Sequence, residues 1–198
     1  GMILRTNGLP KLETVYLFGN GLGDAHMQAL CEGLGRGAAP SLDFLHLASN
    51  DFGPAGAEAL AAALRRGAMP NLGTLALGAN PIGNEGVTAL AAPLRELSAL
   101  QMLYFAECGI DDEGVASLLD NLDKDDFKKL THLELVRNQI TEVGCAKMVA
   151  VLRAGALPAI KELYCTGWKE SFSEHASEAA NAAVGSALQM RLDAKQEG

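Results

Sequence analysis

The sequence has no apolar run long enough to cross a bilayer, since its longest unbroken runs are a few residues and a spanning helix needs about 20. Residues 1–10, GMILRTNGLP, also lack the apolar segment of a secretory signal peptide. We therefore expect a cytoplasmic, intracellular protein without a membrane partner.

Basic residues and metal-binding cysteines are scarce as well. The 198 residues carry a net charge of −8, with 16 Lys and Arg against 24 Asp and Glu. This balance argues against nucleic acid as a partner, because surfaces that bind nucleic acid cluster Lys and Arg. The four cysteines include no CxxC pair and have no His at ligand spacing. The sequence thus predicts no metal site and no other cofactor.

What the sequence has is a repeat with a period of about 30 residues. Five segments align, and they begin at Leu12, Leu42, Leu72, Leu100 and Leu130, in steps of 30, 30, 28 and 30 residues. They read LETVYLFGNGL, LDFLHLASNDF, LGTLALGANPI, LQMLYFAECGI and LTHLELVRNQI, and a degenerate sixth copy, IKELYCTGWKE, begins at residue 160. A fixed period of this length predicts a solenoid.

Each repeat changes its hydrophobic spacing partway along. Leu75 and Leu77 alternate with small or polar residues, which indicates a short strand with one buried face. About ten residues later, Val87, Leu90 and Leu94 are spaced to lie on one face of a helix. Strands stack about 4.8 Å apart, whereas helices need about 8–10 Å. The stacked repeats should therefore curve into a short arc with a parallel sheet on the concave face and helices on the convex face.

The pattern LxxLxLxx(N/C)xL resembles that of leucine-rich repeats, and the long repeat resembles the ribonuclease-inhibitor-like subfamily. The resemblance covers nearly the whole chain and implies an α/β, right-handed leucine-rich-repeat solenoid of about six repeats. We expect one domain over residues 1–198. Residues 1–11 are expected to be the tail of an incomplete first repeat. Full repeats are expected at 12–41, 42–71, 72–99, 100–129 and 130–159. A degenerate repeat with a C-terminal capping helix is expected at 160–198, the helix itself spanning 173–193.

Helix punctuation recurs in register with the repeat. Asp111 and Thr141 are the expected N-caps, and Pro93 is expected to kink its helix or end it early. A column of glycines in the first helical turn indicates close backbone packing and comprises Gly56, Gly86, Gly114 and Gly144. The run LGANPIGNEGVTAL has the glycine content of a phosphate-binding loop, but its Asn and Gly residues have counterparts in the other repeats. We therefore interpret it as the corner between a strand and a helix.

One column of the repeat is expected to be structural and comprises Asn20, Asn50, Asn80, Cys108 and Asn138. These side chains are expected to bond the backbone where each strand turns into its loop. Cys108, Cys145 and Cys165 are expected to be buried free thiols, whereas Cys31 is the cysteine expected to be exposed. The charged run at 120–129 is interpreted as a solvated edge, and His26 as a surface substitution.

The outward strand positions form the candidate binding site, because solenoids use the concave sheet for recognition and the core does not need those side chains. Two columns align across the six strands: Thr14, Phe44, Thr74, Met102, His132, Glu162 and, beside it, Tyr16, His46, Ala76, Tyr104, Glu134, Tyr164. The predicted partner-binding residues are Tyr16, Phe18, Phe44, His46, Met102, Tyr104, His132, Glu134, Glu162 and Tyr164.

A third column, next to these two, comprises Phe18, Ala48, Gly78, Ala106, Val136 and Thr166. Small residues at the centre of the columns, such as Ala76 and Gly78, are flanked by aromatic residues. This pattern predicts a shallow groove about 24 Å long for a helix or an extended peptide. The alternative is that the aromatic side chains are half-hidden against one another or buried in a self-dimer.

These features predict a non-enzymatic module that binds a protein or peptide on its concave face, with Glu134 and Glu162 selecting a basic group. No acid, base and nucleophile converge in the pattern, so no catalytic residue is predicted. The alternative is a part of a larger regulatory protein, of the GTPase-activating or nucleotide-oligomerisation receptor-like kind. Self-association through the N-terminal end, where no cap is recognisable, is compatible with both.

Overall fold

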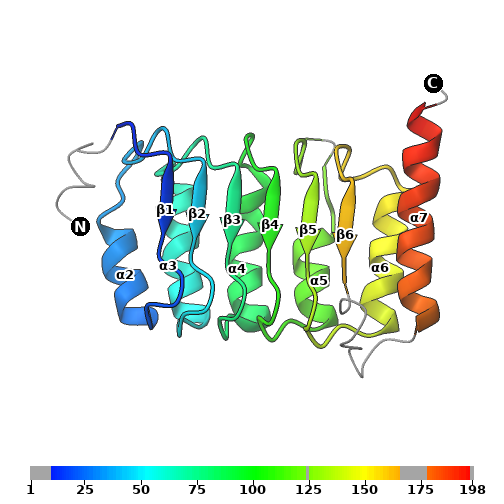
Figure 1. Ribbon diagram of the computed structural model, residues 1–198, viewed down its shortest axis with the longest axis horizontal. Coiled ribbons are helices and arrows are strands. Elements are labelled where there is room, and N and C mark those ends of the chain that lie inside the picture. Colours follow the sequence, from blue (N-terminus) through cyan, green and yellow to red (C-terminus); the bar gives the residue numbers. More distant parts are fainter. Residues whose placement is uncertain (1–9, 124, 166–177, 197–198) are drawn as a thin grey trace.

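The structure is a computed structural model that describes residues 10–123, 125–165 and 178–196 (Figure 1). Its strands are β1 Thr14–Tyr16, β2 Phe44–His46, β3 Thr74–Ala76, β4 Met102–Tyr104, β5 His132–Glu134 and β6 Glu162–Tyr164. Its helices are α2 Asp24–Glu32, α3 Pro54–Arg65, α4 Gly83–Arg95, α5 Asp112–Leu119, α6 Glu142–Arg153 and α7 Glu178–Gln196.

The strands form one parallel sheet in the order of the sequence, and each helix packs against the next one along the chain. Figure 1 shows the helices behind the sheet, so that the opposite face of the sheet carries no helix among the described residues. The predicted α/β solenoid, with the sheet on the concave face, is therefore confirmed.

The register of the sheet matches the alignment of the repeats. Across β1 to β6, both predicted columns are paired residue by residue, from Thr14 and Tyr16 at one edge to Glu162 and Tyr164 at the other. The 28-residue repeat keeps this register because its two missing residues fall between α4 and β4 rather than in the strand. The concave face thus presents the residues that the alignment placed there.

The core lies between the sheet and the helices. Leu75 and Leu77, which flank the outward Ala76, are fully buried, as are Val87 and Leu90 of α4. The same inward positions are buried in the other central repeats, which is the alternation expected of strands covered on one face. Burial of these side chains, each stabilising by about 1.5–3 kcal/mol, holds neighbouring repeats together.

The predicted N-caps are confirmed at α5 and α6. The side chain of Asp111 accepts the N–H of Glu113, and that of Thr141 accepts the N–H of Val143. A second kind of cap links neighbouring repeats. Asp112, the first residue of α5, accepts the N–H groups of Thr141 and Gly144 at the start of α6, each over 2.9 Å.

The glycine column lies in the first turn of the helices, where each helix meets the preceding repeat. A Cβ on Gly144 would come within 2.5 Å of the capping Asp112 Oδ1 and 2.6 Å of Ile140 Cγ2. Gly56 is equally confined, since its Cβ would lie 2.8 Å from Asp24 Oδ1. The close packing predicted for these glycines is therefore confirmed. The lateral caps cause it at Gly56 and Gly144, whereas Gly86 packs against Ile82 and Ala57.

Pro93 does not end its helix early, although an early end was one of the two outcomes expected of it. Helix α4 continues past Pro93 to Arg95 and has 13 residues. Proline has no N–H, so the carbonyl of Ala89, four residues earlier, loses its helical donor. The guanidinium of Arg65 on α3 donates to this carbonyl instead, with Nη2 2.9 Å from the oxygen. The neighbouring repeat thus compensates for the missing hydrogen bond.

The ends of two further helices, α2 and α5, differ from the spacing of the sequence. Helical spacing in the sequence extends to Leu34 in one repeat and to Leu122 in another, but both residues lie beyond the ends of α2 and α5. Leu122 follows Asn121, whose positive φ of 53° is incompatible with continuing the helix. Helix α7 begins in the described residues at Glu178 and lies where the capping helix is expected, and its buried residues are Val184 and Ala187. Residues 173–177 of the predicted helix lie outside the described residues, as does Trp168.

Candidate functional site

The first half of the concave face is an aromatic cluster at the edge of the sheet. We call it the β1–β2 cluster, and it comprises Tyr16, Phe18, Phe44 and His46. The ring centroids lie 5.3 Å apart for Tyr16 and Phe44 and 5.3 Å apart for Phe18 and His46, within the range of favourable ring contacts. Tyr16 and Phe18 are nonetheless 71% and 57% exposed, so the rings contact one another and still face solvent.

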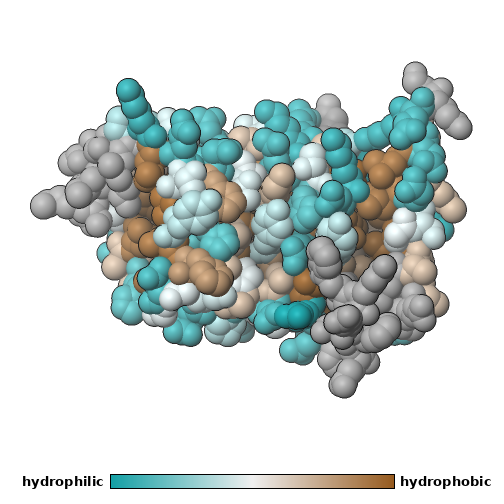
Figure 2. Space-filling model, viewed as in Figure 1, coloured by the Kyte–Doolittle hydropathy of each residue, from teal (hydrophilic) through white to brown (hydrophobic). Residues whose placement is uncertain are grey.

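A strip of small side chains follows at β3. Ala76 is only 6% exposed, and a Cβ on Gly78 would lie 3.1 Å from the carbonyl oxygen of Ala106. Both residues are buried, so neighbouring side chains cover most of this strip, although little side chain projects from it. Figure 2 looks onto this face and shows apolar, brown surface at the β1–β2 end and polar, teal surface over β5. The small residues therefore separate two chemically different halves.

The second half is the β4–β6 cluster, which comprises Met102, Tyr104, His132, Glu134, Glu162 and Tyr164. His132 lies between two tyrosines, with ring centroids 5.0 Å from Tyr104 and 5.4 Å from Tyr164. Its Nδ1 lies 2.8 Å from Oε2 of Glu162, which also accepts the hydroxyl of Tyr164 over 3.2 Å. Glu162 is therefore already paired within the protein.

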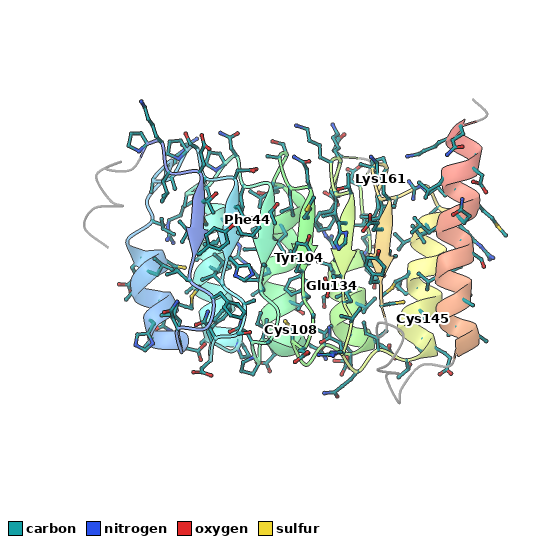
Figure 3. All side chains as sticks on the ribbon, viewed as in Figure 1. Phe44, Tyr104, Cys108, Glu134, Cys145 and Lys161 are labelled. Atoms are coloured by element: carbon teal, nitrogen blue, oxygen red, sulfur yellow. The ribbon has the colours of Figure 1, made fainter. Side chains whose placement is uncertain are left out.

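The field of this cluster is negative. Burial raises the pKa of the Tyr104 hydroxyl, and the charges of Glu134 and Glu162 raise it further. The two glutamates are the charged residues of the predicted strand columns, which contain no Lys or Arg. In Figure 3, the labelled Tyr104 and Glu134 lie beside each other on neighbouring strands. The concave face thus runs from an apolar half to an acidic half.

All ten predicted partner-binding residues lie on this face, four in the first cluster and six in the second. The sequence columns did not reveal the pairing of His132 with Glu162, although their neighbouring positions in one column were a usable signal. The aromatic side chains form two clusters of rings over β1, β2 and β4–β6, and the 24 Å groove expected across all six strands stays a prediction.

The Asn column bonds the backbone at the ends of the strands. Asn138 Nδ2 donates to the carbonyls of Phe105 and Leu135, and its Oδ1 accepts the N–H of Cys108 over 2.9 Å. Asn50 bridges its own repeat and the preceding one in the same way. Asn80 donates to the carbonyls of Leu47 and Leu77. The Nδ2 groups of all three are therefore occupied by the backbone, whereas the buried Oδ1 of Asn80 has no hydrogen-bond partner.

The cysteines carry no catalytic arrangement among the described residues. All four are free and buried, which corrects the expectation that Cys31 is exposed: it lies in α2 and packs into the core at 2% exposure. Burial raises the pKa of Cys31 to about 11 and that of Cys108 to about 12. A mutual hydrogen bond lowers the pKa of Cys145 and raises that of Cys165.

We expect these buried thiols to make stability fall at alkaline pH. A thiol with an ordinary pKa of 9.0 ionises in the unfolded chain, whereas Cys31 and Cys108 stay protonated in the folded protein up to about pH 11 and 12. The stabilisation is complete below pH 9 and is lost as pH rises toward 11. Between pH 8 and 10 we expect the free energy of unfolding to fall by roughly 2 kcal/mol through these two groups.

Urea unfolding under reducing conditions at the two pH values measures this fall. Other groups also titrate in this window, so the comparison is with the C31A/C108A variant, whose dependence on pH should be flatter by about that amount. An equally steep dependence in the variant would contradict the assignment.

The rest of the described surface offers no second site of this kind. In the charged run at 120–129, Lys128 pairs with Asp125, and Asp120 pairs with Lys147 of α6, as expected of a solvated edge. No cluster of metal-binding side chains occurs in the part of the chain that the structure describes. None of its helices there is both long and apolar enough to traverse a membrane.

The β1 end of the core is less covered than the centre. Leu12, Val15 and Leu17 are half-buried, whereas their counterparts in the next repeat are buried. Leu12 and Val15 line an apolar recess of about 60 Å³ together with Met27 and Leu30. Self-association through this end stays a prediction.

Comparison with known proteins bears on the fold. The family model described as Leucine Rich repeat matches residues 38–61, 68–91 and 128–149. No curated protein sequence matches the chain. The tropomodulin C-terminal domain of Caenorhabditis elegans is similar in structure, with a TM-score of 0.53 and 14% identity over 98% of this chain and 92% of that one.

Leiomodin-1 actin-binding site 2 is also similar in structure, with a TM-score of 0.55 and 10% identity over 98% of this chain and 88% of that one. These likenesses show the leucine-rich-repeat fold. Assignment to the ribonuclease-inhibitor-like subfamily stays a prediction.

Proposed function

We propose that this chain is a non-enzymatic interaction module that binds a protein segment on its concave face. The observation that carries the proposal is the pair of aromatic clusters on either side of the small residues of β3. Tyr16 and Phe18 are large apolar side chains that remain more than half exposed. Exposed aromatic residues gathered on one face are typical of binding surfaces, and tyrosine is enriched among the residues that carry binding energy.

The shape of the face favours a protein segment over a small molecule. The facing edges of the two clusters lie over β2 and β4. These strands are two strand intervals, or about 10 Å, apart. This separation is close to the diameter of a helix and leaves ample room for an extended peptide. The strip between them lies low because Ala76 and Gly78 are small, and both residues are buried, so a bound segment would contact mainly the rings of the two clusters.

The test is capture of proteins from native lysate by the immobilised chain, identified by mass spectrometry. The test variant is Y16A/F44A/Y104A, which removes rings from both clusters. The matched control is V143A/M190A, because Val143 and Met190 are 69% and 66% exposed on the helical side. Purified actin is included as a defined partner, because one structural neighbour is described as an actin-binding site.

Proteins that bind the concave face should be retained by the wild type and the control and reduced about tenfold or more by the test variant. Circular dichroism should show that both variants keep the fold, since the replaced side chains are at most half-buried. Retention of the same proteins at the same level by the test variant would show that the concave face is not the binding site.

A further inference from the structure

The acidic half of the concave face contains one carboxylate that the protein itself leaves unused. Glu162 is paired with His132 and accepts the hydroxyl of Tyr164. The carboxylate of Glu134 makes no hydrogen bond or ion pair with any described residue, although its side chain is half-buried. A half-buried charge without a partner costs stability, and a cation from outside would offset that cost.

Glu134 is flanked by an aromatic residue on each side. Tyr104 of β4 and Tyr164 of β6 are its direct partners in the parallel register, about 4.8 Å away on either hand. Their rings lean on His132, which fixes them in place. The hydroxyl of Tyr104 donates to Met102 and that of Tyr164 to Glu162, so both rings lie toward the neighbouring column. A group that reaches Glu134 therefore meets a carboxylate beside two tyrosine rings, and both the charge and the ring faces attract cations.

We propose that Glu134, Tyr104 and Tyr164 form a subsite for an arginine side chain of the bound protein. A guanidinium is planar, so it can stack on a tyrosine ring while it donates two parallel N–H groups to the carboxylate. An ammonium group is a compact point charge and lacks the planar fork needed for two parallel hydrogen bonds to one carboxylate. The neighbouring Met102, which is 38% exposed, offers apolar surface to the methylene stem of the arginine. This inference rests on the proposed function and deepens it.

The charges of the surrounding surface support the same assignment. The strand columns of the concave face contain Glu134 and Glu162 but no Lys or Arg, and the whole chain has a net charge of −8. A basic segment is therefore attracted to this face and meets no like charge in the columns. The negative field is also visible in the raised pKa of Tyr104, to which both carboxylates contribute after burial.

The two halves together define a spacing for the partner. Strand β2 is the nearer strand of the β1–β2 cluster to Glu134. It lies about three strand intervals, or ~14 Å, from β5, which carries Glu134. A partner that uses both halves presents an apolar side chain and an arginine at about this distance. In an extended peptide the two residues are about four positions apart, and on a helix that crosses the strands they are about nine apart.

The test uses a small arginine compound and needs no identified partner. Nα-acetyl-L-arginine methylamide is titrated into the full chain and followed by ¹⁵N–¹H NMR. We expect saturable shifts of amides in β4, β5 and β6, with a dissociation constant on the order of millimolar. The E134Q variant should bind about tenfold more weakly. The matched control E85Q makes the same change of charge at an exposed position on α4 and should bind as the wild type does.

Two analogues test the chemistry of the bound group. The citrulline compound has the same shape without the charge and should give no saturable shift, and the lysine compound should bind several-fold more weakly than arginine. The proposal is overturned if E134Q binds as tightly as the wild type, if either analogue equals arginine, or if the shifts lie outside β4–β6.

The outcome is separable from that of the capture experiment. If no arginine site is found but capture still depends on the concave aromatic residues, only this inference is contradicted. An intact arginine site with capture that ignores those aromatics would contradict the proposed function.

Discussion

Replacing Asp112 with alanine is expected to lower the free energy of unfolding by about 3 kcal/mol. Its Oδ1 accepts two backbone N–H groups at the start of α6, from Thr141 and Gly144, and its Oδ2 accepts the hydroxyl of Thr141. These N–H groups have no helical acceptor, so removing the carboxylate leaves them unsatisfied in a partly buried site. Urea unfolding followed by circular dichroism measures the loss.

The neighbouring residue provides the control for this prediction. Glu113 follows Asp112 in the same helical turn but is exposed, so E113A should change stability by no more than about 0.5 kcal/mol. The D112N variant keeps the oxygen that accepts both N–H groups and should fall between the two. If D112A lost no more than E113A, the lateral cap would not contribute to the contact between α5 and α6.

The concave face could be predicted because the repeat is periodic. Once the strands align, a residue's place in its repeat fixes its strand, its face and its neighbours. The structure pairs Tyr104 with Glu134 and Glu134 with Tyr164 as the alignment did. This worked across the shortened repeat as well, since a solenoid absorbs length changes in its loops and helices while the parallel ladder keeps its register.

Features that depend on one repeat reaching into another could not be predicted. Nothing in the spacing of Pro93 indicates that Arg65, on the helix before, donates to the carbonyl that this proline leaves without a donor. Long side chains have many rotamers, and the choice among them is made by local contacts rather than by the period. The exposure expected for Cys31 was also wrong, since α2 turns this residue toward the core rather than toward solvent.

The candidate site shows the same division. Its residues could be predicted as a set, but not which of its two carboxylates is occupied. Glu134 and Glu162 are both outward residues of neighbouring strands and belong to adjacent columns. Only the placement of His132 beside Glu162 shows that one charge is satisfied and the other is available. The proposal of an arginine subsite therefore depends on the structure.

Replacing Phe105 with alanine is expected to lower the free energy of unfolding by about 3–5 kcal/mol. Phe105 follows β4 at an inward position that other repeats fill with leucine, as at Leu77 and Leu135, and it is fully buried. Its ring fills the core at the centre of the sheet, where repeats on both sides limit any collapse of the cavity. Urea unfolding measures the loss of stability.

The leucine variant separates loss of the ring from loss of burial. F105L restores the residue that the repeat usually has at this position, so it should cost only about 1 kcal/mol. The backbone N–H of Phe105 donates to the carbonyl of Glu134, which ties this core position to the strand that carries the proposed arginine subsite. Hydrogen exchange in F105A should therefore quicken first around β4 and β5, because each repeat of a solenoid is held mainly by its neighbours. If F105A cost no more than F105L, or if exchange quickened uniformly along the chain, the ring would not be a local support for this part of the concave face.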